Sequence, residues 1–379
     1  MIATDTKIWL SSPHMGGREQ YYVNEAFKSN WIAPLGPNVE GFEKDLGQYL
    51  GDGNHVAALS SGTAAIHLAL LLCGVKQGDH VLCQSFTFAA SANPITYLGA
   101  HPVFIDSEDT TWNLCPDLLE NAIKDFINKG KKPKAIVAVH LYGMPYQVEK
   151  IHSLAKEYDI PVVEDSAEAL GSTFKGEKCG SFGTFSILSF NGNKIITTSG
   201  GGALVCRNDQ EKQKAVFLAT QARDEAPHYQ HSQVGYNYRM SNVTAGIGRG
   251  QMEVLEDRVI ARRANYEFYR DRLSGYRSIE FLKEPADTFS NRWLTCVLLN
   301  NNETRERIRL SLQENNIESR PLWKPMHLQP VFQDETAYLS GVSETLFNRG
   351  LCLPSGSDLT ENDLLRIVGI IEKELNNDK

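Results

Sequence analysis

Short apolar runs recur along the first part of the chain, and segments of helical length separate most of them. The runs fall at residues 56–59, 81–83, 103–105, 136–139, 161–163, 185–188 and 203–205. Strands that are buried on both faces of a parallel sheet show this continuous apolar pattern, and the helices between them cover the two faces. The alternation therefore predicts an α/β fold with a mostly parallel seven-stranded sheet between helices.

The pattern changes after residue 250. Apolar side chains at near-heptad spacing from Met252 to Leu273 predict one long amphipathic helix. Beyond it, the sequence predicts a strand, a second helix, and a last helix that Thr360 opens with Asp363 as its capping partner. The strand is expected over residues 293–299 and the second helix over residues 304–315.

These two patterns divide the 379 residues of the chain into two domains. We expect a large domain over residues 13–250. A smaller α+β domain is expected over residues 251–379, and it also includes residues 1–12.

Polar residues that follow the runs are candidates for a site, because ligands bind at the carboxyl ends of strands in such sheets. Gly62 and Thr63 follow the first run and open a helix, whose free N–H groups and dipole would attract an anion. An ordinary helix cap at Ser61 or Thr63 explains the same residues. Phe86 and Phe88 follow the second run. They alternate, so only one can stack on a ligand ring, and core packing is the other interpretation of either.

Acidic residues come directly after the fifth run. A buried acid is costly unless it is paired, and a carboxylate beside a pyridinium nitrogen keeps that nitrogen protonated. Asp165 is placed for this role, and Glu168 follows on the same side of a helical turn. A helix N-cap with a first-turn acid remains the alternative. We interpret His140 as a core or rim histidine and Asp106 as a turn or cap residue.

Lys194 stands between the sixth and seventh runs, after Ser189 and before a glycine-rich stretch at residues 200–202. Taken alone, it is a lysine on a hairpin. Taken with the other strand ends, it completes a set that pyridoxal phosphate requires: an anion site, an aromatic face, an acid for the ring nitrogen and an amine for a Schiff base. The order of these residues favours that cofactor.

Composition excludes several other classes of protein. The net charge of −8 argues against nucleic acid as a partner. The seven cysteines form no CxxC pair, which indicates a reducing compartment. His228 and His231 lack further ligands around them, so we expect no metal site. The N-terminus has no apolar signal core and no apolar run could span a bilayer, so we expect a cytoplasmic protein without membrane insertion.

Several blocks of the sequence resemble one known family. SSGTAAIHLAL, SFTFAASANP, EDSAEALGS, SFNGNKIITTSGGG and GYNYRMSN are similar to blocks of the DegT/StrS-type sugar-nucleotide aminotransferases. HMGG, SNWIAPLGP, RPLWKPMH and LCLPSG resemble its PglE-like subgroup, the aminotransferases of UDP-N-acetylbacillosamine synthesis. The resemblance implies the aspartate aminotransferase (type I) fold and pyridoxal phosphate as the cofactor.

The resemblance also implies a role for each site residue. Lys194 would carry the cofactor as a Schiff base and move the proton, and Asp165 would pair with the pyridine nitrogen. The remaining cofactor contacts that it implies are Phe88 on the ring and Gly62, Thr63 and Ser189 at the phosphate.

Two further residues carry implications of their own. Asn237 would reach the phosphate of the neighbouring subunit, so the resemblance implies a homodimer with shared active sites. Glu168 stands where most of the family has histidine or glutamine near the phenolic oxygen of the cofactor. A carboxylate and a phenolate repel one another unless one carries a proton.

The implied reaction moves the amino group of L-glutamate to carbon 4 of a UDP-linked 4-keto-6-deoxy sugar, UDP-2-acetamido-2,6-dideoxy-4-keto-hexose. Candidate contacts for that substrate are Trp31, Arg239, Arg320, Lys324 and His327. The alternatives are another keto-sugar nucleotide (3-keto, or dTDP- or GDP-linked) and a non-catalytic regulator with the same fold. A dehydratase of this fold has histidine in place of the lysine, so Lys194 argues against it. A cysteine desulfurase would need a mobile catalytic cysteine, which the sequence does not offer.

Overall fold

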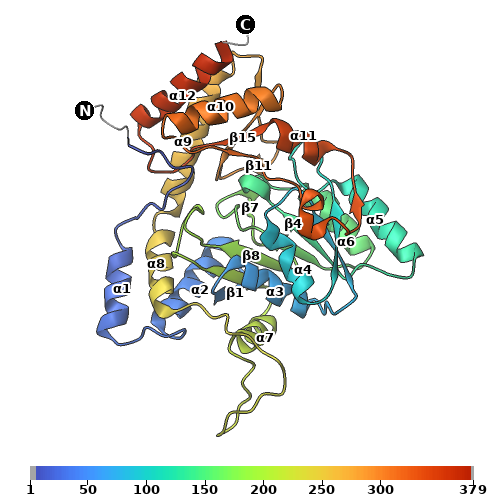
Figure 1. The fold of residues 1–379 in the computed structure, drawn as a ribbon. Coiled ribbons are helices and arrows are strands. Elements are labelled where there is room, and N and C mark those ends of the chain that lie inside the picture. Colours follow the sequence, from blue (N-terminus) through green and yellow to red (C-terminus); the bar gives the residue numbers. More distant parts are fainter. Residues whose placement is uncertain (1–5, 377–379) are drawn as a thin grey trace.

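The computed structural model describes residues 6–376, and its largest sheet has eight strands (Figure 1). The strand order is β1-β9-β8-β5-β4-β2-β3-β14. All seven predicted strands are present, as β1 (His55–Leu59), β2 (His80–Gln84), β3 (His101–Ile105), β4 (Ala135–Val139), β5 (Val162–Asp165), β8 (Phe185–Ser189) and β9 (Gly202–Cys206). β9 is antiparallel to both of its neighbours, and the other pairings are parallel. The predicted α/β class is confirmed.

The eighth strand, β14 (Ala337–Tyr338), has no counterpart among the predicted strands. It pairs in parallel with β3, in a register that places Ala337 opposite Phe104. Two residues are too few to produce an apolar run or a period in the sequence. This edge strand therefore leaves no sequence signal.

Helices cover both faces of the large sheet, because alternate strand residues on each face are apolar and buried. One face packs against α3 (Gly62–Leu72), α4 (Asn93–Tyr97) and α7 (Asp209–Ala219). The other packs against α2 (Pro37–Leu50), α5 (Pro116–Asn128), α6 (Val148–Glu157) and α8 (Asn242–Met252). α1 (Glu19–Lys28) lies against α8. Four short 3₁₀ turns are η1 (Ala89–Ser91), η2 (Leu141–Gly143), η3 (Met326–Leu328) and η4 (Pro330–Phe332).

The C-terminal part has its own antiparallel sheet, in the order β10-β12-β15-β13. Its strands are β10 (Ile279–Phe281), β12 (Thr295–Leu299), β13 (Arg320–Pro321) and β15 (Gly350–Leu353). Its helices are α10 (Asn302–Glu314), α11 (Val342–Arg349) and α12 (Glu361–Asn376). In Figure 1, α10 and α12 lie at the end of the molecule away from α7, and α9 (Leu255–Leu273) extends toward them. α9, α10 and α12 share one apolar core with the inner face of this sheet. Leu346 of α11, Cys296 and Cys352 pack instead in a cluster with Phe86 and Tyr142, which follow β2 and β4 of the large sheet.

One contact crosses the predicted domain boundary, and a second joins two segments that the prediction places in the same domain. β11 (Thr288–Phe289) completes a small sheet with β6 (Thr173–Phe174) and β7 (Glu177–Lys178). Near the N-terminus, Ile8 forms a parallel bridge with Ile317 of the C-terminal part. The division into residues 13–250 and 251–379 with 1–12 stays a prediction.

The predicted helix from Met252 to Leu273 is wrong in one respect, because it is interrupted. α8 ends at Met252 and α9 begins at Leu255. The backbone at Val254 leaves the helical region. The Val254 side chain packs closely on Gly16, and a Cβ added to Gly16 would lie 2.8 Å from Cγ2 of Val254. The predicted cap of the last helix is present, since Thr360 and Asp363 exchange hydrogen bonds between backbone N–H and side-chain oxygen.

None of the helices within residues 6–376 combines the length and the apolar composition that crossing a membrane requires.

Candidate active site

Lys194 lies on the connection between β8 and β9, which are antiparallel neighbours in the large sheet. Hydrogen bonds close the base of this connection: the Phe190 N–H donates to the Gly201 carbonyl at 2.9 Å, and the Thr198 N–H donates to the Phe190 carbonyl at 2.9 Å. Ile195 and Ile196 are buried behind the lysine. The connection is therefore an anchored loop between two antiparallel strands, and not a surface turn.

The amine of Lys194 faces a carboxylate and an aromatic ring. Its Nζ lies 3.3 Å from Oε1 of Glu168 and 4.4 Å from the ring centroid of Trp293. The lysine side chain is 12% exposed and the Glu168 side chain 4%. This ion pair is thus almost fully removed from water.

Burial changes the acidity of Glu168. It raises the pKa of this carboxyl to about 7, and the negative charge of Asp165 acts in the same direction. The ammonium of Lys194 and the N–H of Tyr142, which donates to Oε2 at 2.7 Å, oppose the rise without cancelling it. Glu168 can therefore gain or lose a proton near neutral pH.

The N–H that reaches Glu168 depends on an unusual backbone conformation. Tyr142 has a φ of 55°, in the left-handed region that residues other than glycine seldom adopt. Its hydroxyl accepts a hydrogen bond from the Trp323 N–H at 2.9 Å, and its ring is buried. The turn after β4 is held by one contact of the Tyr142 backbone and one of its hydroxyl, and nothing in the sequence indicated either.

The last two residues of β5, Glu164 and Asp165, point to opposite faces of the sheet. Glu164 is a structural residue. It lies 2.8 Å from His140 Nε2 and accepts hydrogen bonds from the hydroxyls of Ser166 and Ser186 and from the N–H groups of residues 180, 182 and 183. Burial alone would raise its pKa, but these bonds, His140 first, lower the pKa to about 2. The interpretation of His140 as a satisfied core histidine is confirmed.

Asp165 lines a cavity on the other side. Its Oδ2 accepts a hydrogen bond from Ser91 Oγ at 2.7 Å, and its Oδ1 accepts one from the Ala167 N–H at 3.1 Å. Thr87 in turn lies 2.8 Å from Ser91, hydroxyl to hydroxyl. The carboxylate is therefore fixed in orientation. Sequence reasoning missed Ser91, because a serine in a short turn carries no signal of its partner.

The sequence left two interpretations of the start of α3 open, a helix cap and an anion site, and both apply. Ser61 Oγ caps the helix by accepting from the Ala64 N–H at 3.0 Å. The N–H groups of Gly62 and Thr63 precede that bond and are those a helix N-terminus offers to an anion. A Cβ on Gly202 would lie 2.3 Å from the Gly62 nitrogen, so only glycine lets β9 approach this closely. Within residues 6–376, the hydroxyls of Thr63 and Ser189 form no hydrogen bond.

One cavity of about 310 Å³ collects most of the predicted cofactor residues. Those that line it are Gly62, Thr63, Phe88, Asp165, Glu168, Ser189 and Lys194. Phe88 is 58% exposed while Phe86 is buried in the core, so only one of the two faces the cavity, as their alternation predicts. Trp293 and Trp323 also line it, and sequence reasoning missed both as site residues.

Other predicted residues lie outside this cavity. The guanidinium of Arg239 donates to Glu43 at 2.7 Å and to the Ala58 carbonyl at 3.0 Å. His327 lies 2.6 Å from the Ser85 hydroxyl. Asn237 and Trp31 are exposed elsewhere on the chain. The roles predicted for these four residues stay predictions.

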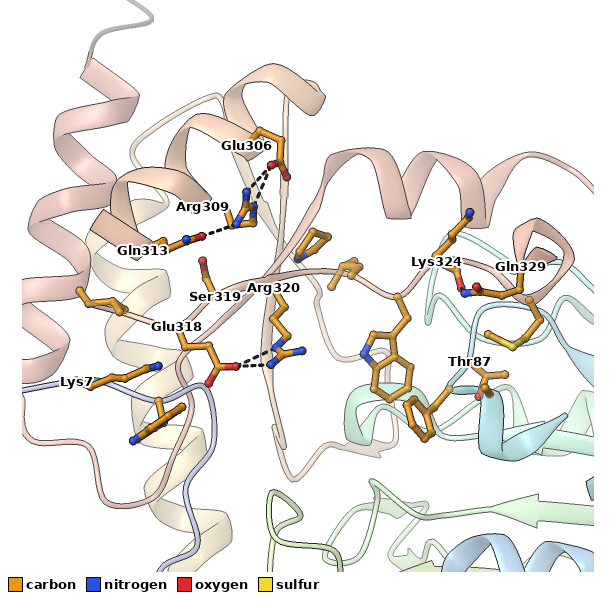
Figure 2. A pocket seen from close by; sticks show the side chains of 18 of the residues that line it. Lys7, Thr87, Glu306, Arg309, Gln313, Glu318, Ser319, Arg320, Lys324 and Gln329 are labelled. Atoms are coloured by element: carbon orange, nitrogen blue, oxygen red, sulfur yellow. Dashed lines mark hydrogen bonds and ion pairs between the residues drawn. The ribbon is translucent and has the colours of Figure 1, made fainter. Parts of the chain in front are cut away.

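A larger groove of about 1120 Å³ adjoins the cavity and shares Thr87, Phe88 and Trp323 with it. Figure 2 shows its cationic side chains spread along the wall. Arg320 pairs with Glu318 at 2.7 Å, whereas Lys324 forms no ion pair in the described part of the chain. The three shared residues make the groove continuous with the cavity.

The residues of the cavity fit pyridoxal phosphate. The start of α3, where only glycine allows the close approach of β9, is an anion site, Asp165 is an oriented carboxylate, and Lys194 supplies an amine. Phe88 supplies an aromatic face at the mouth. No group of three potential metal ligands occurs among the residues that the structure describes.

Comparisons with known proteins agree with this assignment. The DegT/DnrJ/EryC1/StrS aminotransferase family matches residues 13–372. EpsN of Bacillus subtilis (strain 168), provisionally named a pyridoxal phosphate-dependent aminotransferase, is 53% identical over 369 residues, which are 96% of this chain and 95% of EpsN. GDP-perosamine synthase of Escherichia coli O157:H7 is 37% identical over 358 residues, 94% of this chain and 95% of that protein. Spr1654 of Streptococcus pneumoniae, provisionally named a sugar aminotransferase and solved in its PLP form, superposes with a TM-score of 0.89 at 26% identity, covering 98% of this chain and 99% of that chain.

We predict that the rate at which the cofactor-free protein captures pyridoxal phosphate rises with pH through a midpoint at about 7. Above the pKa of Glu168 the ionised carboxylate can accept the Lys194 proton and leave a reactive neutral amine, and below it both groups keep their protons. The charged groups nearest to Glu168 are Lys194 and Asp165. Glu168→Gln cannot accept the proton, so its profile should lack this midpoint. Visible absorbance after mixing measures the rate.

Glu256→Gln is the matched control, because Glu256 pairs with Lys178 at 3.4 Å on the surface. This variant should keep the wild-type profile. A midpoint that persists unchanged in Glu168→Gln would contradict the assignment of the titration to Glu168.

Proposed function

Because the chain belongs to the DegT/DnrJ/EryC1/StrS aminotransferase family, we propose that it moves the amino group of L-glutamate to carbon 4 of a UDP-linked 4-keto-6-deoxy sugar. The expected substrate is UDP-2-acetamido-2,6-dideoxy-4-keto-hexose, and the product is its 4-amino sugar nucleotide. The enzyme is a pyridoxal phosphate-dependent sugar aminotransferase. The observation that carries the proposal is the pairing of Lys194 with buried Glu168 in the cavity that Asp165 also lines.

Pyridoxal phosphate supplies an aldehyde carbon that carries the amino group and a ring that takes up electrons. Lys194 would hold the aldehyde, and Asp165 would keep the ring nitrogen protonated. The N–H groups of Gly62 and Thr63 and the hydroxyl of Ser189 would bind the phosphate, which is favoured at the positive end of α3. Each of these residues lines the same cavity.

Proton transfer is the task of the lysine and its neighbour. A free, neutral Lys194 would take up on its Nζ the proton from the carbon next to the donor nitrogen, and would release it from the same atom when the amino group has moved. Glu168, 3.3 Å from the amine, can accept one proton from the ammonium, which leaves a neutral amine beside a neutral carboxyl. The two substrates use one cavity in turn, so we expect ping-pong kinetics.

The nucleotide would occupy the groove beside the cavity. Its wall carries Lys324 and Arg320 close to Trp323, which lines both spaces, so a diphosphate that leaves the cavity passes these cations. His327 lies 2.6 Å from the Ser85 hydroxyl, so any contact of His327 with the substrate would be made from this position.

A homodimer with shared sites would explain why some predicted contacts lie outside the cavity. Asn237 and Trp31 are exposed, and the segment that joins α7 to α8 projects from the rest of the chain (Figure 1). In a second copy these residues, and Arg239, could approach the neighbouring cavity. We keep the division into domains at residue 250 as part of this proposal. A cytoplasmic location is supported by seven cysteines that are all free thiols.

A GDP-linked substrate is the second candidate, because relatives at 35–37% identity are named GDP-perosamine synthases. A 3-keto or dTDP-linked sugar and a regulator without turnover are the remaining alternatives. The sequence blocks that resemble the PglE-like subgroup favour a UDP-linked sugar over these alternatives.

We expect turnover when the enzyme is incubated with glutamate and UDP-2-acetamido-2,6-dideoxy-4-keto-hexose, followed as 2-oxoglutarate and amino sugar. GDP- and dTDP-linked 4-keto sugars and a 3-keto sugar nucleotide complete the panel. Lys194→Ala should bind the cofactor noncovalently and lose on the order of 1,000-fold or more in rate, because the base is gone. Full activity of this variant would sink the mechanism. Turnover only with a GDP sugar would favour the second candidate, and bound cofactor without any turnover would favour the regulator.

Lys324→Ala should raise KM for the sugar nucleotide about 10-fold, because a charge-assisted bond to phosphate is lost, and should leave the glutamate half-reaction unchanged. Lys76→Ala is the control, since Lys76 is exposed and lines neither space. Equal KM values for Lys324→Ala and Lys76→Ala would contradict the proposal that the nucleotide binds in this groove.

Mixing two inactive variants tests whether sites are shared. Lys194→Ala and Asn237→Ala, unfolded and reassociated in equal amounts, should recover about a quarter of the wild-type activity, because half of the dimers are mixed and each has one intact site. Lys194→Ala with Asp165→Ala is the control, since both residues line the same cavity of one chain and no intact site can form. If the first mixture stays as inactive as the second, Asn237 does not serve a neighbouring site.

A further inference from the structure

The peptide immediately before Lys194 is held from outside its loop by two side chains. The carbonyl of Asn193 accepts a hydrogen bond from Ser11 Oγ at 2.7 Å and another from Trp293 Nε1 at 2.7 Å. Within the described chain, these are the only backbone hydrogen bonds that connect residues 191–196 to another segment. The orientation of the Lys194 peptide therefore depends on Ser11 and Trp293.

A third residue, Arg262 of α9, fixes both donors. Its Nη1 donates to the Trp293 carbonyl at 2.5 Å and its Nη2 to Ser11 Oγ at 2.9 Å. An arginine only donates, so the hydroxyl of Ser11 must direct its own proton away, toward the Asn193 carbonyl. The direction of every bond in the chain from Arg262 to Asn193 is thus determined.

Arg262 is held in a costly environment. Its side chain is 1% exposed, no carboxylate in the described residues pairs with it, and its Nε has no partner. Burial lowers its pKa to about 10. The charge of Asp358 opposes this shift without cancelling it. Burying a guanidinium without a paired carboxylate is unfavourable, so a purely structural role would be served as well by an apolar residue.

Trp293 contacts both the backbone just before Lys194 and the amine at the end of the Lys194 side chain. Its indole N–H holds the carbonyl that precedes Lys194, and its ring lies 4.4 Å from the lysine amine. The ring is buried and stacks with Tyr142, the residue whose N–H holds Glu168. A shift of Trp293 would therefore move the amine relative to the carboxylate.

We propose that Ser11, Trp293 and Arg262 are positioning residues for Lys194. They fix the peptide before the lysine so that its amine faces Glu168 and the cavity. The proposal rests on the proposed function in one respect, that Lys194 is the reacting amine. It gives the N-terminal segment and α9, neither of which lines the cavity, a part in the chemistry.

Ser11→Ala tests the proposal with little risk to folding, because Ser11 is only half-buried. It should slow capture of pyridoxal phosphate by the cofactor-free protein about 3- to 10-fold, the loss expected for one hydrogen bond, and should reduce the visible circular dichroism of the bound cofactor. Trp293→Phe keeps a ring but loses the N–H and should have a similar effect. Together the two changes should slow capture on the order of 100-fold, because the carbonyl then has no donor.

Ser12→Ala is the matched control, since the neighbouring Ser12 hydroxyl forms no hydrogen bond within residues 6–376 and should be silent. Ser11→Thr retains the hydroxyl and should restore the wild-type rate. Thermal unfolding of each variant separates a loss of stability from a loss of positioning.

Capture rate and circular dichroism require no substrate, so they are independent of whether the sugar is the proposed one. A wild type that captures the cofactor but does not respond to glutamate would refute the proposed function and leave the positioning test intact. Ser11→Ala and Trp293→Phe that match Ser12→Ala in both readouts would overturn the positioning role.

Discussion

The burial of one ion pair is the constraint on which the site depends. Lys194 and Glu168 lie 3.3 Å apart and are almost entirely removed from water, and the raised pKa of Glu168 shows what that burial costs the ionised carboxylate. Water would otherwise stabilise both charges, and the pair would then have no reason to exchange a proton. The aromatic side chains around it, Trp293 foremost, exclude that water and replace it with a ring face for the ammonium. Reactivity at neutral pH follows from this exclusion.

The end of β5 shows how one strand separates structure from chemistry. Glu164 and Asp165 are adjacent acids, and the pleat sends them to opposite faces. Glu164 receives six hydrogen bonds, keeps a low pKa and joins β5 to β8 and to the turn at residues 180–183. Asp165 receives two and faces the cavity. Because the first acid fixes the strand end, one serine hydroxyl and one backbone N–H are enough to orient the second.

The sequence was sufficient to predict the repeated apolar strands and the site residues that directly follow them. The seven main strands are continuous apolar runs, and parallel strands bring the residues after them to one edge, so Gly62, Asp165 and Lys194 could be assembled without coordinates. Ser91, Tyr142 and Trp293 could not. Their roles depend on one hydroxyl direction, one positive φ and one ring that arrives from the C-terminal part. No local pattern encodes such contacts between distant segments, and the interruption between α8 and α9 likewise reflects the packing of Val254 on Gly16.

The loop that carries Lys194 also depends on contacts between distant segments, because residues of the C-terminal part and of the N-terminal segment hold its middle. The connection between β8 and β9 is twelve residues long, from 190 to 201, and its own backbone closes it at the base and adds one hydrogen bond in the middle, from the Lys194 N–H to the Asn191 carbonyl. Its middle must be held by other segments, or the amine would sample many positions and lose the advantage of a preorganised site. Trp293 precedes β12, and the N-terminal segment that carries Ser11 joins the C-terminal part at Ile8 and Ile317. Trp293 packs in an apolar cluster that joins the C-terminal part to Phe86 and Tyr142 of the large domain. Any displacement of the C-terminal part relative to the large sheet would therefore be transmitted through Trp293 and Ser11 to the peptide that carries the reacting amine.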